Sequence, residues 1–117
     1  MTNANLTMNV EYLNDTTSII RIQGDITAAA ESKLMDAYTA ASQNGTKVII
    51  LDFTNLEYMN SSGIGLLVTL LIRAQRRNQK LMAVGLSEHY QQIFELTRLN
   101  EAISIHDSAA TAKATLS

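Results

Sequence analysis

The 117-residue chain contains no cysteine, no proline and no tryptophan. Without cysteine it can form neither a disulfide nor a cysteine-based metal site, and nothing in the sequence points to an oxidising compartment. The two histidines, His89 and His106, are too few and too isolated to suggest metal ligands. We therefore expect no metal and no cofactor, and the lack of proline fits a compact domain without a stiff tail.

Long apolar runs and a strong net charge are also missing. The longest apolar run, Gly63–Ile72, is about half of the ~20 residues that a membrane span needs, so we interpret it as a core helix. The N-terminus has neither the basic start nor the apolar segment of a secretion signal, which predicts a cytoplasmic protein. The formal net charge is −2, from 9 basic and 11 acidic residues, and it indicates no direct binding to nucleic acid.

Segments typical of strands alternate with segments typical of helices along the chain. This alternation predicts an α/β fold in a single domain, 1–117, with a mixed, largely parallel sheet of about five strands packed against about four helices. The N-terminal strand pair should give the sheet its mixed character, and the helices should be segregated by face. Strands are expected at 8–13, 18–23, 47–53, 81–85 and 103–105, and helices at 27–43, 61–78, 87–98 and from 108.

The junction between an apolar strand and the long apolar helix is the most informative part of the chain. Thr54–Asn60 interrupts the apolar pattern and is expected to form a polar turn, after which Ser61 and Ser62 fall at the start of the helix. The residues expected on the core face of that helix are Ile64, Leu67, Val68, Leu71 and Ile72.

A serine at a helix start can be a cap, an anion ligand or a phosphate acceptor. The first N–H groups of a helix lack intrahelical partners and carry partial positive charge, so they can hold an anion. Capping is the commonest of the three roles, and position alone favours it for Ser61 and Ser62. A phosphate there would add about −1.5 to −2 of charge, which the helix dipole accommodates.

Three segments of the chain resemble the STAS domain, the fold of bacterial anti-sigma factor antagonists. Tyr58–Gly65, placed after an apolar strand, is similar to the signature of that family. Arg21–Thr27 resembles its upstream strand-to-helix turn, and Leu81–Leu86 with Ile93–Leu99 resembles its last full strand and the following helix. The segments occur in the family's order and span nearly the whole chain, so the resemblance implies a STAS fold.

The resemblance implies a small adaptor and not an enzyme. Members of the family work by partner switching: the unphosphorylated form binds an anti-sigma factor that is itself a serine kinase, and so frees a sigma factor. The kinase would phosphorylate Ser61, with Ser62 as the alternate acceptor, and a serine phosphatase would restore the active form. The residues expected to contact the partner are Gly24, Asp25, Ile26 and Thr27 in the first turn, and Asn60, Ser61, Ser62, Gly63 and Ile64 in the second.

One residue departs from the family pattern. The family commonly has an aspartate immediately before the acceptor serine, where this chain has Asn60. Asparagine keeps a carbonyl acceptor and tolerates turn conformations, but it carries no negative charge. We therefore interpret Asn60 as a capping or turn residue that lacks the acidic group.

Two further classes of function remain open from the sequence. The same fold can serve as an accessory module of another assembly, such as a lipid-transport complex or a stress-signalling scaffold. It can also be a regulatory domain that holds a nucleotide or phosphate at the helix start. Catalysis is not expected, because the chain has no Gly-x-Ser-x-Gly motif and the glycines after Ser62 lack the lysine of a phosphate-binding loop.

Overall fold

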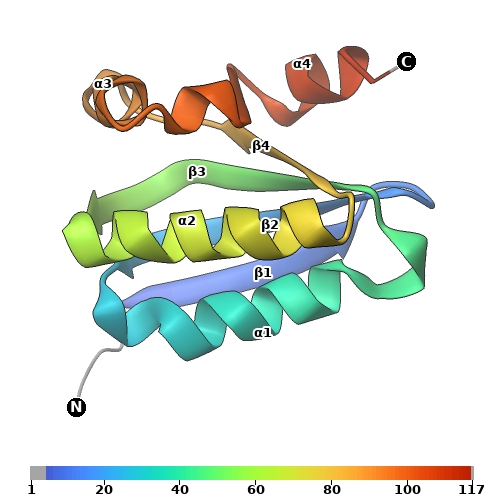
Figure 1. Cartoon of the computed structure of the whole chain (residues 1–117), viewed down its shortest axis with the longest axis horizontal. Coiled ribbons are helices and arrows are strands. Elements are labelled where there is room, and N and C mark those ends of the chain that lie inside the picture. The colour runs from blue at the N-terminus through green and yellow to red at the C-terminus, as the bar shows by residue number, and fades with distance from the viewer. Residues whose placement is uncertain (1–4, 117) are drawn as a thin grey trace.

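The computed structural model describes residues 5–116, so the two ends of the expected domain 1–117 lie outside the described residues. Five strands alternate with four α-helices, as the sequence predicted (Figure 1). The strands are β1 (Leu6–Tyr12), β2 (Thr17–Ile26), β3 (Val48–Met59), β4 (Lys80–Val84) and β5 (Ile103–His106), and the helices are α1 (Glu31–Ala41), α2 (Ser61–Arg76), α3 (Glu88–Leu96) and α4 (Ala109–Ala114).

The strands form one sheet in the order β1-β2-β3-β4-β5, which is also their order in the chain. β1 and β2 are joined by a short turn and therefore pair antiparallel. Each later pair is parallel because a helix carries the chain back across the sheet between its strands. The predicted mixed, largely parallel sheet is thus confirmed.

The helices are divided between the two faces of this sheet. Ile20 and Leu51 belong to the core cluster that contains residues of α1, α2 and α3. Ile19 and Ile50 point to the opposite face, because successive side chains of a strand alternate, and they pack with Ala112 of α4. α1 and α2 lie side by side over the first face, as Figure 1 shows. The helices are therefore segregated by face, as expected.

β2 and β3 are longer than the sequence predicted. Pairing continues through Asp25 opposite Tyr58 and Ile26 opposite Met59, so β2 does not end at residue 23 and β3 does not end at residue 53. The expected polar turn 54–60 is therefore wrong over most of its length. Beyond Asp52, β3 no longer pairs with β4, so this part of the strand can hold polar residues. In a sequence, a polar stretch of this kind is typical of a loop.

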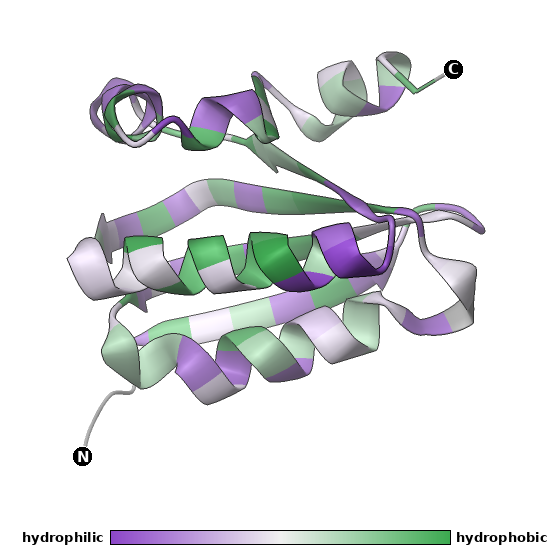
Figure 2. Ribbon diagram, in the orientation of Figure 1, coloured by the Kyte–Doolittle hydropathy of each residue, from purple (hydrophilic) through white to green (hydrophobic). Residues whose placement is uncertain are grey.

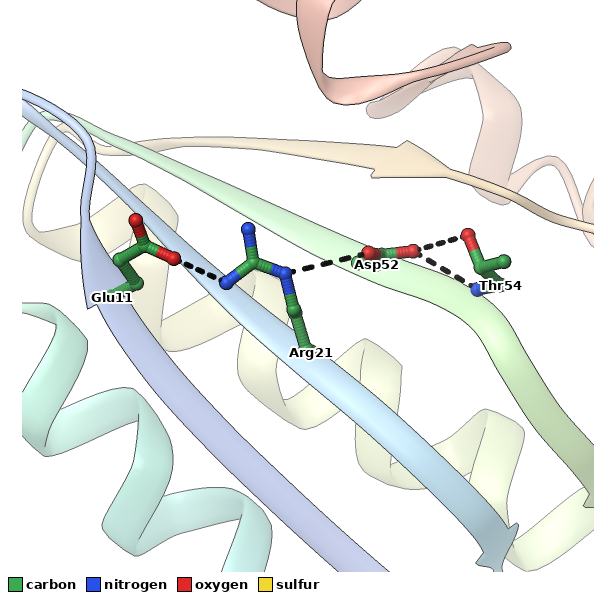
Figure 3. Close-up of polar contacts among 4 residues, drawn as sticks. All are labelled: Glu11, Arg21, Asp52 and Thr54. Carbon is green, nitrogen blue, oxygen red and sulfur yellow. Dashed lines mark hydrogen bonds and ion pairs between the residues drawn. The ribbon is translucent and has the colours of Figure 1, made fainter.

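A row of polar side chains marks the point at which β3 leaves β4 (Figure 3). The Asp52 Oδ1 atom accepts hydrogen bonds from the backbone N–H of Thr54 at 3.0 Å and from its hydroxyl at 2.6 Å. Arg21 lies between Glu11 and Asp52, so its guanidinium links β1, β2 and β3 on the face opposite α1 and α2. Because Arg21 and Glu11 are about half exposed, their ion pair adds no more than about 1 kcal/mol to stability.

The buried face of α2 differs from the predicted one. Gly63, Leu67, Leu70 and Ala74 are buried, whereas Val68 and Ile72 are 39% and 45% exposed. Of the predicted core positions only Leu67 is fully buried, and Ile64 and Leu71 are half-buried. From Ile64 to Ile72 the helix carries no charged residue and has large apolar residues on most sides (Figure 2), so its periodicity does not fix which side faces the sheet.

The helix boundaries differ from the predicted ones by a few residues. Thr27 is a cap as expected, but it caps a short 3₁₀ turn, Ala28–Ala30, that leads into α1. The other end of α1 is followed by a second 3₁₀ turn, Gln43–Gly45. No helix within residues 5–116 is long and apolar enough to cross a membrane.

Candidate functional site

The two segments expected to contact a partner lie at the same end of the sheet. Ile26 and Met59 are opposite one another in the parallel pairing of β2 and β3, so the chain leaves both strands at one edge. The N–H of Asn60 donates to the carbonyl oxygen of Ile26 at 3.3 Å. The predicted proximity of the Gly24–Thr27 segment and the serine pair is therefore confirmed by backbone contact.

Asn60, and neither serine, caps the serine-bearing helix. The Asn60 side-chain oxygen accepts from the N–H of Gly63 at 2.9 Å, and its backbone is extended. The interpretation of Asn60 as a cap is confirmed, whereas capping by Ser61 or Ser62 is wrong. The two serines are the first two residues of α2 and both are exposed, so their hydroxyl groups are free of the capping role.

Gly63 allows the start of α2 to approach β2 closely. A Cβ atom added there would lie 2.3 Å from the carbonyl oxygen of Ile26 and 2.8 Å from the Cγ atom of Met59. These distances are too short for any side chain, so glycine is required. Gly65, two residues later, is exposed and has no atom within 4 Å of such a Cβ. The contact of α2 with β2 thus requires a glycine at position 63 but not at position 65.

Tyr90 of α3 fixes the end of β3 just before the serines. Its hydroxyl oxygen accepts a hydrogen bond from the N–H of Met59 at 2.8 Å, and both residues are buried. A tyrosine on an amphipathic helix reads in the sequence as an ordinary core residue, and no motif connects it with position 59. Sequence reasoning therefore missed Tyr90 as a residue that positions the serine pair.

The nine residues expected to contact a partner differ in exposure. Gly24, Ile26 and Gly63 are buried, Asp25, Thr27, Asn60 and Ile64 are half-buried, and Ser61 and Ser62 are exposed. The three buried residues support the expected contact surface from below, and the other six contribute exposed or half-buried side chains to it. Tyr58, which is 50% exposed at the end of β3, adds an aromatic ring that sequence reasoning did not include.

The start of α2 suits a negative charge. The N–H groups of Ser61 and Ser62 precede the first intrahelical hydrogen bond, and the 16-residue helix directs its partial positive charge toward them. The histidines make other contacts: His106 hydrogen-bonds Ser104 at 2.9 Å, and the His89 ring packs against Tyr90. Among residues 5–116 neither histidine makes a hydrogen bond to Ser61. The arrangement can accept a phosphate on a serine.

Fold and site together define a small α/β domain that presents an exposed serine pair at a helix start beside the end of a mixed sheet. The sequence profile described as the STAS domain matches residues 8–112. The chain belongs to the STAS domain family.

Relatives with known roles agree with this assignment. An anti-sigma-B factor antagonist of Staphylococcus aureus is 26% identical over 88 residues, which cover 75% of this chain and 82% of the relative. The solved structure of an anti-sigma factor antagonist from Mycobacterium paratuberculosis has a TM-score of 0.79 at 17% identity and covers 98% of this chain and 97% of its own. The Bacillus cell fate determinant SpoIIAA in its phosphorylated form has a TM-score of 0.73 at 20% identity and covers 95% of this chain and 100% of its own. Such relatives are regulatory proteins and not enzymes, as the sequence predicted for this chain.

Proposed function

We propose that this single-domain chain is an anti-sigma factor antagonist controlled by phosphorylation of Ser61. In the unphosphorylated state it binds an anti-sigma factor that is also a serine kinase, and this binding releases a sigma factor. The kinase phosphorylates Ser61 and a serine phosphatase reverses the modification, so the chain acts as a switch in the cytoplasm. The observation that carries this proposal is the exposed Ser61 at the first position of α2, next to a cap supplied by another residue.

The proposed docking surface combines the serine turn with the end of β2. Asp25 and Thr27 lie beside the start of α2 because Ile26 contacts both Asn60 and Gly63. A phosphate on Ser61 would stand inside an interface formed on this surface, where its charge must lose water or meet repulsion. Disrupting a buried charged contact commonly costs about 2–5 kcal/mol, so we expect phosphorylation to weaken binding by a factor of about 30 or more.

The experiment is to incubate the protein with its cognate kinase and ATP and to map the phosphate by mass spectrometry. Phosphate is expected on Ser61. Ser61→Ala should remain folded, bind the kinase and resist modification, whereas Ser62→Ala should still be phosphorylated. Modification of Ser62 with Ser61 untouched would contradict the assignment.

Binding measurements complete the test. Calorimetry with the kinase should show tight binding by the unmodified chain and weakened binding by the phosphorylated chain, with circular dichroism confirming that both are folded. Asp25→Ala should weaken binding, because Asp25 lies in the proposed surface. Phosphorylated protein that binds with undiminished affinity would refute the switch.

A second function within the same family is a module of a different assembly. The fold also matches a sulfate transporter family protein from Wolinella succinogenes, with a TM-score of 0.74 at 19% identity. The neighbouring genes distinguish the two functions. An anti-sigma kinase or a phosphatase gene beside this one favours the switch, and a transporter operon favours the module.

A further inference from the structure

β1 forms one edge of the sheet, and within residues 5–116 no strand pairs with its outer side. Which backbone groups point outward follows from one hydrogen bond. The N–H of Asp25 donates to the carbonyl oxygen of Asn5 at 2.8 Å, so odd-numbered residues of this segment direct their backbone groups toward β2. The even-numbered residues, Leu6, Met8, Val10 and Tyr12, therefore direct their N–H and C=O groups away from the sheet.

A groove runs beside this edge, between β1 and α1. It has a volume of about 430 Å³, and the apolar side chains of Leu6, Met8 and Val10 line the strand side. α1 contributes Ala37 and Ala40 together with one cation, Lys33, and one anion, Asp36. In Figure 1 β1 is the outermost strand and α1 runs alongside it. The edge thus offers both strand hydrogen bonds and an apolar surface with no excess of either charge.

We propose that this edge binds a second copy of the chain, with two β1 strands paired antiparallel about a two-fold axis at Asn9. The sequence of β1 is self-complementary in this register. Met8 pairs with Val10 of the second copy, and Leu6 pairs with Tyr12 of the second copy. Residues whose backbone N–H and C=O groups point outward therefore lie opposite residues of the same kind, as an antiparallel ladder requires. The side chains of Leu6, Met8 and Val10 are apolar, and the Tyr12 ring carries a hydroxyl that already donates to the carbonyl oxygen of Ala40.

The other face of the paired strands is also compatible. Glu11, the one charged residue of β1, lies opposite Thr7 of the second copy, and Asn9 lies opposite its own counterpart. No like charges face each other across the axis. This complementarity favours a second copy over an unrelated strand, because one segment satisfies both sides of the interface.

Lys33 limits the strength of this pairing. Its ammonium group donates from α1 to the carbonyl oxygen of Leu6 at 2.7 Å and so occupies one outward acceptor. A lysine near a sheet edge is a common device against edge-to-edge pairing. In the paired sheet that oxygen accepts from the N–H of Tyr12 of the second copy. The lysine must therefore leave, and we expect a dimer of moderate affinity. Lys33→Ala should lower its dissociation constant.

The paired arrangement leaves both serine sites accessible. Leu6 lies opposite Gly24, so β1 begins at the end of the sheet that carries the serines. Because the two β1 strands run antiparallel, the serine sites of the two copies lie at opposite ends of the continuous sheet. The proposal does not depend on the function of Ser61.

Sedimentation velocity across a micromolar to millimolar range tests the pairing. The wild-type chain should dimerise with increasing concentration. Val10→Pro removes an outward N–H that β2 does not use and should abolish the dimer, while Val10→Ala keeps that N–H and should retain it. A wild-type chain that stays monomeric would overturn the proposal, and a strand of another protein would then be the alternative partner of this edge. So would a Val10→Pro protein that dimerises as Val10→Ala does.

The register has its own test at the two-fold axis. Asn9→Asp and Asn9→Lys each place like charges opposite one another, and each should raise the dissociation constant by up to about fivefold. An equimolar mixture of the two variants should form heterodimers more tightly than either variant forms homodimers. Circular dichroism of each variant verifies folding. A mixture that associates no better than its components would refute pairing at Asn9.

Discussion

Tyr90 shows how a single hydroxyl group sets the position of residues distant in the chain. The N–H of Met59 is buried at the end of β3 and donates to the Tyr90 oxygen, one residue before the cap of α2. Removal of that oxygen leaves a buried donor without an acceptor, which costs about 1–3 kcal/mol.

We therefore expect Tyr90→Phe to lower the free energy of unfolding by about 1–3 kcal/mol. Urea denaturation followed by circular dichroism measures the change. Tyr58→Phe is the matched control, because the Tyr58 ring is half exposed, and it should change stability by less than about 0.5 kcal/mol. Equal effects of the two substitutions would show that the Tyr90 hydroxyl does not support the fold.

Substitutions at Asn60 can test the effect of helix capping and the effect of negative charge separately. Asn60→Asp keeps an oxygen acceptor for the N–H of Gly63 and adds a negative charge, which a helix start favours by about 0.3–1 kcal/mol. Thermal stability should change little, and the rate of phosphorylation or the affinity for the partner should change more. Unchanged kinetics with a large fall in melting temperature would contradict this expectation.

Asn60→Ala provides the complementary measurement. It removes the cap without adding charge and should destabilise the protein by about 0.5–2 kcal/mol. The two substitutions at one position thus distinguish a defect in the helix start from a defect in recognition.

The assignment of the cap also shows what the sequence can and cannot predict at a single residue. The motif located the start of α2 to within one or two residues. It could not decide which of Asn60, Ser61 and Ser62 caps the helix, because all three are good capping residues. The close contact of Gly63 with Ile26 sets that register, and it is a tertiary contact without a local signal.

At the scale of elements, the two glycines of α2 have different roles. A methyl group at Gly63 would collide with the backbone of β2, whereas a methyl group at Gly65 would meet nothing within 4 Å. Helix interiors favour alanine over glycine by up to about 1 kcal/mol, so the two positions should respond to the same substitution with opposite signs.

Gly63→Ala should lower the melting temperature and weaken partner binding, because the start of α2 must move away from β2. Gly65→Ala should raise the free energy of unfolding by about 0.5–1 kcal/mol. Differential scanning calorimetry of the two variants measures both effects. A stabilising Gly63→Ala would mean that the start of α2 can shift without cost.

The order and type of the elements followed from the sequence, but their ends did not. Alternating apolar segments with clear turn residues predicted five strands and four helices. The last part of β3 was missed because Thr54, Asn55 and Glu57 are polar residues on a strand that has lost one neighbour. The buried face of α2 was missed for the opposite reason, since a helix that is apolar on most sides does not show which side packs.

At the scale of the whole molecule, folding and binding should respond to a charge on Ser61 in opposite directions. Ser61→Asp adds a negative charge at the start of α2, away from the core. We expect it to stabilise the fold by about 0.3–1 kcal/mol while weakening the affinity for the kinase. Thermal melting and calorimetry on the same preparation measure the two quantities. A variant that loses both stability and binding would indicate damage to the fold and not a switch.

The order of the strands in the sheet has a consequence for the synthesis of the protein. Each strand is laid down beside the strand that precedes it in the chain, so a segment leaving the ribosome finds its partner already present. Among residues 5–116, no strand must wait for a strand that is synthesised later before it can pair with its first neighbour. The sheet can therefore be extended in one direction during synthesis, from β1 toward β5, with each new strand added at its edge.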